Sequence, residues 1–233
     1  QDIMDNINES YMRVIGRAQK FGFVPLWMTM AGRGGAQWAL PGRQTFGWCW
    51  LHDTVPEVHT SFRAKPTVQY RAQWGIGGDN VEFQGYWQDD GHVETADPKY
   101  RPSYWTRPDS DAKGKTKVLL MVMNMHYRQD DDTTVKVTID PEKLNLPDDW
   151  KVYNLETMPD YVAREKVLDR LDRESNRGYG EVEKDPRRIL GRNTIYWKGE
   201  RKYELDELEV VSGGKKTFTI DVPERDFLTL IVE

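Results

Sequence analysis

The feature that most constrains the fold is a series of short, strand-like segments after residue 75. Each segment is rich in β-branched, aromatic or other apolar residues, and turn residues such as Gly, Pro and Asp separate it from the next. The expected strands are residues 81–87, 103–106, 117–127, 133–140, 150–155, 217–222 and 227–232. Several short strands in succession are typical of an antiparallel sandwich. We therefore predict an antiparallel β-sandwich domain over residues 76–233, with a charged insertion at about residues 160–212.

A different pattern stands at residues 45–54, which read Thr-Phe-Gly-Trp-Cys-Trp-Leu-His-Asp-Thr. Phe46, Trp48 and Trp50 alternate with small or apolar residues, so both faces of an extended segment would be apolar. This is typical of a strand buried inside a parallel sheet. His52 and Asp53 then fall where the strand leaves the core, and in α/β proteins this end of a strand binds ligands. Alternatively, the pair only hydrogen-bonds the turn, which is a common role for Asp.

The segments around this one complete an α/β pattern. Residues 1–22 have apolar residues at helical spacing, residues 23–31 form an apolar run of strand length, and residues 56–74 indicate a helix broken by Pro66. The order of helix, strand, strand and helix predicts a fragment of a parallel α/β fold over residues 1–75. Two parallel strands cannot close a barrel and would expose apolar edges. We therefore expect the remainder of a longer polypeptide, or a second chain, as a partner.

Composition excludes several classes of partner and site. The net charge is −5, and no concentrated basic face is present, which argues against nucleic acid. The longest apolar runs are far shorter than the roughly 20 residues of a membrane span, so we expect a soluble protein with no membrane partner. The single cysteine, Cys49, excludes an internal disulfide and any multi-cysteine metal site. We predict that it is a core residue, because reactive thiols lie in exposed, electropositive surroundings.

Neither a cofactor nor a metal is predicted. The glycines of the loop at residues 32–44 match neither the dinucleotide fingerprint nor a P-loop. His52, Asp53 and His59 could together ligate a metal, but a separation of seven between the histidines matches no standard ligand spacing. A metal-dependent hydrolase built on these histidines remains the third of the functional alternatives.

Aromatic and polar residues in the first half of the chain indicate carbohydrate binding. Trp38 lies beside Arg33 and Gln37 in the glycine-rich loop, and Tyr86 and Trp87 precede a polar run. Flat aromatic faces stack on the C–H face of a pyranose, whereas amides, carboxylates and guanidinium groups bond its hydroxyls. The predicted substrate-binding residues are His52, Asp53, Trp50, Trp38, Arg33, Gln37 and Glu57. The alternative is that the tryptophans only pack in the core.

No catalytic residue is assigned. Glycoside hydrolysis requires two carboxyl groups about 5 to 10 Å apart, one of which holds a proton at the working pH. The carboxylates between Asp53 and Asp90 do not form a pair that spacing singles out. A Ser-His-Asp triad is also unsupported, because no serine lies in a Gly-x-Ser-x-Gly pattern.

Taken in order, several motifs resemble the tail of a large bacterial glycoside hydrolase, in which a (β/α)8 barrel is followed by an antiparallel β-domain. They are Phe-Gly-Trp-Cys-Trp-Leu-His-Asp at 46–53, the strands at 81–87, 117–124 and 135–140, Val-Tyr-Asn-Leu-Glu at 152–156, and the closing run at 217–232. The resemblance implies an α/β part followed by an all-β part, with residues 1–75 as the last helix and strand units of the barrel. It also implies that the catalytic carboxylates lie upstream of Gln1.

Two main hypotheses on function follow. In the first, the chain is the C-terminal part of a glycoside hydrolase or related carbohydrate-active enzyme, secreted or periplasmic, which acts on a polysaccharide or glycan. In the second, it is a non-catalytic β-sandwich module for carbohydrate binding or assembly, and residues 1–75 form a docking arm.

Overall fold

The computed structural model describes residues 9–16, 26–27, 46–56, 74–88, 91–126, 133–155, 206–211, 214–223 and 226–233. The chain divides into two compact units. The first contains Gln1–Trp50, Thr54–Trp74 and Met158–Glu204, and the second contains Leu51–Asp53, Gly75–Thr157 and Leu205–Glu233. Nearly all of the described residues belong to the second unit.

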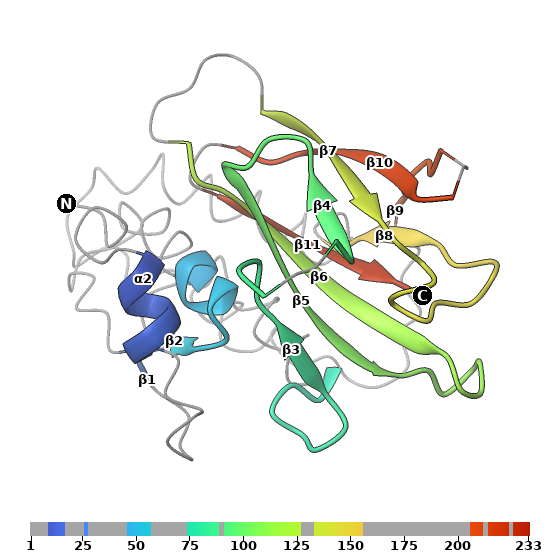
Figure 1. The fold of residues 1–233 in the computed structure, drawn as a ribbon, viewed down its shortest axis with the longest axis horizontal. Helices are drawn as coiled ribbons and strands as arrows, with labels where there is room; N and C mark the ends of the chain where they lie inside the picture. Colours follow the sequence, from blue (N-terminus) through green and yellow to red (C-terminus); the bar gives the residue numbers. More distant parts are fainter. Residues whose placement is uncertain are drawn as a thin grey trace, which may run out of the picture. The chain divides into compact units, whose positions relative to one another are not determined.

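The second unit is built from two antiparallel sheets (Figure 1). The six-stranded sheet has the order β3 (Glu82–Gln84), β5 (Tyr100–Pro108), β6 (Thr116–Asn124), β11 (Phe227–Val232), β8 (Val152–Asn154) and β9 (Asp206–Glu207). The three-stranded sheet has the order β10 (Lys216–Asp221), β7 (Thr134–Ile139) and β4 (Val93–Thr95). The long hairpin of β5 and β6 dominates the larger sheet, and β11, from the C-terminal end of the chain, pairs with β6.

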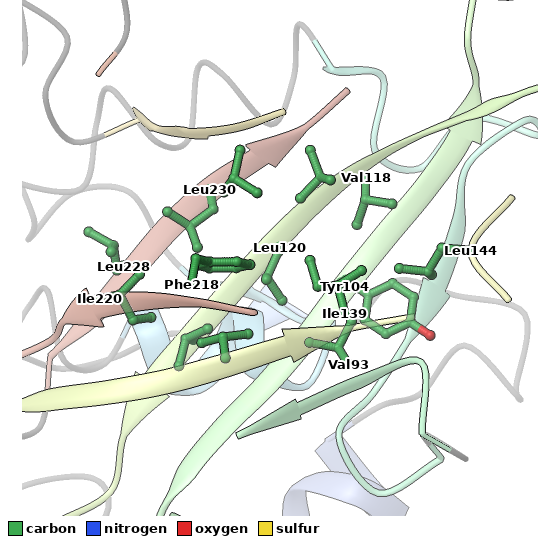
Figure 2. Packing of buried hydrophobic residues seen from close by; sticks show 14 of the residues in the cluster. Val93, Tyr104, Val118, Leu120, Ile139, Leu144, Phe218, Ile220, Leu228 and Leu230 are labelled. Atoms are coloured by element: carbon green, nitrogen blue, oxygen red, sulfur yellow. The ribbon is translucent and has the colours of Figure 1, made fainter. Parts of the chain in front are cut away.

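The hydrophobic core lies between these sheets (Figure 2). Tyr104 of β5 pairs with Leu120 of β6, which pairs with Leu230 of β11, so one row of side chains crosses the larger sheet. Phe218 pairs with Val137 in the smaller sheet, and all five side chains belong to one buried cluster. Burial of such a side chain stabilises the fold by about 1.5 to 3 kcal/mol.

The second face of the six-stranded sheet is also buried. Leu119, Met121 and Met123 point away from the core cluster because successive side chains of a strand alternate between faces, yet each is at most 1% exposed. The short segment Leu51–Asp53 belongs to this unit, and Ser103 Oγ of β5 donates a hydrogen bond to the Leu51 carbonyl at 2.9 Å. Burial on both faces explains why β6 is almost continuously apolar.

An ion cluster joins the β5–β6 hairpin to the last residue of the sequence. Lys117 Nζ lies 2.9 Å from Asp111 Oδ2, 3.0 Å from Glu233 Oε2 and 3.5 Å from Asp109 Oδ1. Burial lowers the pKa of Lys117, but its hydrogen bonds to Asp111 and Glu233 outweigh this effect and hold the pKa above its ordinary value. Lys117 therefore remains charged at any pH below its ordinary pKa of 10.5.

The prediction of an α/β portion from a (β/α)8 barrel is wrong. The described residues are mostly antiparallel sheet with very short helices, and no barrel portion is evident among them. In the first unit, the predicted helix at residues 1–22 is described only as α2 (Glu9–Tyr11) and the π-helix η1 (Met12–Gly16). The parallel pairing in the described residues joins β1 (Leu26–Trp27) to β2 (Val55–Pro56) and spans two residues on each side.

The expected strand at residues 45–54 is also wrong, because residues 46–51 are helical. Every side chain from Phe46 to Thr54 is at most 8% exposed. A helix that is buried on all sides shows no polar stripe, so its sequence resembles that of a strand buried on both faces. The run is also short enough for either structure.

The individual strands of the predicted sandwich are present as β3, β5, β6, β7, β8, β10 and β11. The structure adds β4 and β9, which the sequence pattern did not indicate. Most of the predicted insertion at residues 160–212 lies outside the described residues, and the domain limits inferred from sequence stay a prediction. Within the described part of the chain, no helix is long and apolar enough to cross a membrane.

Candidate functional site

The candidate site begins at the C-terminal end of the helix at residues 46–51. Asp53 has a backbone φ of 54°, in the left-handed region, where Asp and Asn are the favoured residues after Gly. The Thr54 backbone N–H donates to the Cys49 carbonyl at 3.0 Å, and the Thr54 hydroxyl donates to the same oxygen at 2.9 Å. This arrangement is a Schellman-type helix end. Asp53 is therefore the capping residue that reverses the chain.

His52 is enclosed by two aromatic rings of the second unit and is 0% exposed. It stacks on Trp87, with ring centroids 5.4 Å apart and an interplanar angle of 19°. Tyr86 meets it edge-on at 5.7 Å and 79°, and a 3.4 Å hydrogen bond joins Tyr86 Oη to His52 Nε2. The histidine thus supports both rings from the buried side.

Asp53 is tied to the six-stranded sheet. Its Oδ1 accepts a hydrogen bond from Trp105 Nε1 at 2.9 Å, and Asp53 and Trp105 are 8% and 2% exposed. A buried indole N–H needs such an acceptor, since leaving it unpaired costs about 1 to 3 kcal/mol. Trp105 in turn packs against Phe83 of β3, with ring centroids 5.2 Å apart.

Ser103 joins the helix end to the turn that follows β3. Its hydroxyl donates to the Leu51 carbonyl at 2.9 Å and accepts from the Tyr86 backbone N–H at 3.1 Å. Ser103 is fully buried, so no water competes for these bonds. The hydroxyl therefore fixes the position of the turn relative to His52.

The turn at residues 85–88 orients Trp87. The Gln88 backbone N–H donates to the Gly85 carbonyl at 2.8 Å, and Gln84 Nε2 donates to the Gln88 carbonyl at 2.6 Å. A Cβ atom at Gly85 would lie 2.5 Å from the indole of Trp87, which is far inside van der Waals contact. Only glycine therefore lets the indole fold back over the backbone.

Tyr86 and Trp87 together form what we call the aromatic platform. Both are half-buried, with ring centroids 5.0 Å apart and an interplanar angle of 87°. The Arg101 guanidinium lies 5.3 Å from the centre of the Tyr86 ring, within reach of a cation–π interaction, and also donates to the Pro98 carbonyl. Polar neighbours of the platform in the described part of the chain include Arg101 and the turn residues Gln84 and Gln88, which hydrogen-bond within the turn.

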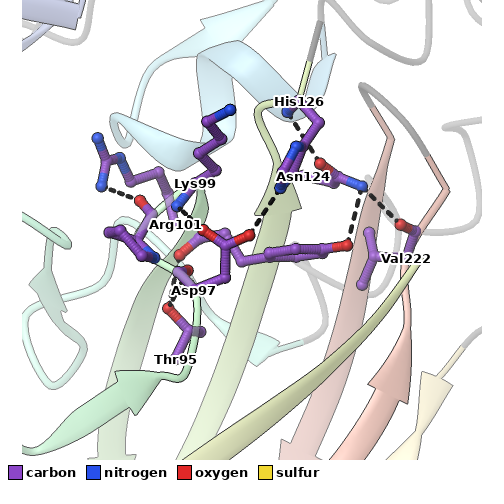
Figure 3. Close-up of polar contacts among 9 residues, drawn as sticks. Thr95, Asp97, Lys99, Arg101, Asn124, His126 and Val222 are labelled. Atoms are coloured by element: carbon purple, nitrogen blue, oxygen red, sulfur yellow. Dashed lines mark hydrogen bonds and ion pairs between the residues drawn. The ribbon is translucent and has the colours of Figure 1, made fainter. Parts of the chain in front are cut away.

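A second polar cluster begins beside Arg101 (Figure 3). Asp97 Oδ2 lies 2.7 Å from His126 Nε2, and Asp97 Oδ1 accepts from the Lys99 backbone N–H at 2.8 Å. The Lys99 N–H is the main cause that holds the pKa of the Asp97 carboxyl below its ordinary value of 3.8, and His126 adds to it, although burial acts in the opposite direction. The Asn124 side chain accepts from the His126 backbone N–H and donates to Tyr100 Oη.

The structure brings together only part of the set predicted from sequence. His52 and Asp53 lie at the platform, whereas Trp50 is 3% exposed and packs edge-on against Phe46 in the first unit. Four further predicted site residues, Trp38, Arg33, Gln37 and Glu57, lie outside the described residues. Their roles stay predictions.

The sequence pattern indicates that Tyr86 and Trp87 are suited to sugar binding, but it does not indicate that His52 packs against them. It missed Ser103 and Arg101 altogether. Ser103 lies 52 residues from Leu51 in sequence, and no local pattern marks such a pairing. The one available signal was Gly85 directly before two aromatic residues, because an isolated glycine in a strand pattern suggests a close backbone approach.

Among the described residues, no group of three or more His, Cys, Asp and Glu side chains could hold a metal ion. His59, the second histidine of the metal alternative, lies outside them. Comparison of the chain with protein-family models, with curated proteins and with solved structures found no match. The relation to glycoside hydrolases therefore stays a prediction that rests on the order of motifs in the sequence.

Proposed function

We propose that this chain is the C-terminal part of a glycoside hydrolase or related carbohydrate-active enzyme that acts on a polysaccharide or glycan. It contributes a structural β-sandwich and residues that bind the substrate. The catalytic carboxylates belong to the remainder of a longer polypeptide or to a second chain. The enzyme is secreted or periplasmic, where polymeric glycans are met.

The observation that carries the proposal is the aromatic platform with its polar surroundings. Two half-buried rings at the end of β3 offer apolar area for the C–H face of a pyranose. The amides of Gln84 and Gln88 and the guanidinium of Arg101 are of the kind that bonds sugar hydroxyls. Because the buried His52 packs against both rings, the rings keep their orientation without a ligand, and this lowers the entropy cost of binding.

The geometry of His52 and Asp53 fits a second candidate equally well, the non-catalytic carbohydrate-binding module. Asp53 directly follows His52 in the sequence, and its Oδ1 accepts a hydrogen bond from the Trp105 indole. His52 is enclosed between two rings. His52 therefore positions the platform and Asp53 bonds Trp105 of the sheet, and neither buried residue is presented to a substrate as an acid or a base. Both candidates predict carbohydrate binding. Only the first predicts that the whole native protein hydrolyses a glycan.

The test is a calorimetric titration of the full chain with a panel of soluble oligosaccharides. We expect Trp87→Ala to weaken binding by about tenfold or more, which corresponds to about 1.4 kcal/mol of lost stacking and apolar contact. The matched control is Tyr153→Ala, which removes a partly buried ring from β8 of the same sheet. The absence of binding by the unmodified chain, or equal affinities in all three proteins, would contradict the proposal.

A second variant separates ring orientation from ring chemistry. Gly85→Ala leaves both platform rings in the sequence but places a methyl group 2.5 Å from the Trp87 indole. The ring must turn away, so we expect a loss of sugar affinity comparable to that of Trp87→Ala. Gly214→Ala is the control, because its added Cβ meets nothing within 4 Å and its backbone is not left-handed. Unchanged affinity in Gly85→Ala would show that the orientation of Trp87 does not matter.

A further inference from the structure

The relative orientation of the aromatic rings restricts the kind of carbohydrate that the platform can take. The planes of Tyr86 and Trp87 are perpendicular, at 87°, with centroids only 5.0 Å apart. Phe83, the next ring along β3, is tilted by 55° to Trp87 at 6.0 Å. These three neighbouring rings therefore share no common plane.

From this geometry we infer that the platform binds a single soluble glycan chain, through one stacked pyranose at a time, and does not bind the flat surface of an insoluble polysaccharide. The inference rests on the proposed function, because it names the substrate class of the same site. A crystalline polysaccharide presents rows of sugar rings in one plane, and stacking on several of them requires aromatic rings in one plane. Perpendicular rings satisfy that requirement for one ring only.

Protein groups cover one face of each platform ring, which supports the same conclusion. His52 stacks on one face of Trp87, and the guanidinium of Arg101 lies over one face of Tyr86. A sugar can therefore reach each ring from at most one side. The turn at residues 85–88 holds both rings in this arrangement, since Gly85 and the Ser103 hydroxyl fix its backbone.

The polar groups beside the rings also favour a soluble chain. Gln84, Gln88 and Arg101 carry amide and guanidinium groups of the kind that bond sugar hydroxyls. Gln84 Nε2 and Gln88 Oε1 already hydrogen-bond within the turn, so these side chains keep a fixed position. A soluble oligosaccharide exposes the edges of its sugar rings to water, whereas in a crystalline polysaccharide the edges bond to neighbouring chains. A site with polar side chains beside its aromatic rings therefore gains most from a ligand whose hydroxyls are accessible.

The experiment compares soluble and insoluble forms of the same polymers. Cellohexaose and chitohexaose are titrated calorimetrically, together with hexamers of xylose and mannose, and depletion of the protein by microcrystalline cellulose and by chitin powder is measured in parallel. We expect a soluble hexamer to bind with a stoichiometry of one, and Trp87→Ala to weaken this binding by about tenfold or more. We expect depletion by the insoluble polymers to be no greater than that of a serum albumin control.

The outcomes separate this inference from the proposed function. Depletion by an insoluble polymer that Trp87→Ala abolishes, without binding of any soluble hexamer, would overturn the inference and leave carbohydrate binding intact. Absence of binding to every soluble and insoluble ligand would overturn both. If the soluble hexamer binds and both Trp87→Ala and Trp87→Phe bind it as tightly as the unmodified chain, the platform is not the site.

Discussion

The core between the two sheets and the aromatic platform beside β3 are both rich in large apolar side chains, but they are held together differently. In the core, a side chain such as Leu120 is surrounded by other apolar side chains, and no single contact fixes its position. In the platform, each ring depends on a few specific partners, such as the His52 ring, the Ser103 hydroxyl and the absence of a Cβ at Gly85. The core gains stability from buried area, whereas the platform gains a defined orientation from a few contacts.

This comparison predicts that stability and ligand binding respond to different substitutions. Changes in the core should lower the free energy of unfolding and leave the affinity of the folded protein unchanged. Changes in the platform should lower affinity more than stability. Three substitutions outside the platform rings test the stability side of this separation.

The largest effect on stability is expected for Leu120→Ala. Leu120 is 0% exposed and lies in the row between Tyr104 and Leu230, so its truncation loses apolar contact and leaves a cavity. We expect a loss of about 2 to 5 kcal/mol in the free energy of unfolding, measured by urea denaturation. Thr219→Ala, at an exposed position of β10, is the control. A loss below about 1 kcal/mol would mean that the core collapses into the space and is less tightly packed than the structure indicates.

An intermediate effect is expected for Asp53→Ala. Alanine leaves the buried N–H of Trp105 without its acceptor and also adopts the left-handed backbone less readily, so unfolding should become easier by about 1 to 3 kcal/mol. Asp53→Asn retains an acceptor oxygen and tolerates this backbone, so its cost should stay below about 1 kcal/mol. The measurement is chemical denaturation of both variants. Equal losses would show that the carboxylate charge, and not the hydrogen bond or the backbone, is what matters.

The smallest effect is expected for Asp97→Asn. The contact between Asp97 and His126 is partly solvated, with side chains 40% and 27% exposed, so its loss should cost less than about 1 kcal/mol at pH 7. Because folding lowers the pKa of Asp97, the carboxylate stabilises the fold above its ordinary pKa of 3.8, and this contribution is lost as the pH falls through the lowered folded value. Unfolding curves at pH 7 and pH 3 should therefore show a smaller difference between the two proteins at pH 3. A difference that grows towards acid would contradict the assignment.

The strands that sequence analysis predicted correctly are those with a local signal. In β7, Val135, Val137 and Ile139 are buried while Thr134 and Lys136 are exposed, so the period of two residues appears directly in the sequence. The short strands β4 and β9 have too few residues to show any period, and their pairing partners are distant in sequence.

The helix at residues 46–51 shows where such reasoning fails. Phe46, Trp48 and Trp50 do alternate, but the intervening residues are apolar as well. Local pattern cannot distinguish a buried helix from a buried strand in so short a run, because full burial removes the polar stripe that would mark a helix. The expectation of a parallel sheet, and with it the barrel, depended on this segment.

The sequence by itself determined the β-rich second unit, because the alternation of apolar and polar residues and the turn residues between strands are properties of neighbours along the chain. It also marked His52, Asp53, Tyr86 and Trp87 as unusual. Only the tertiary structure decided that His52 packs against Tyr86 and Trp87. The same holds for the bonds by which Ser103 and Trp105 join Leu51 and Asp53 to β5 across 52 residues. Contacts of that kind depend on strand pairing between distant segments, which no local pattern encodes. Gly85 marks a close approach in the sequence, but not which ring occupies the space.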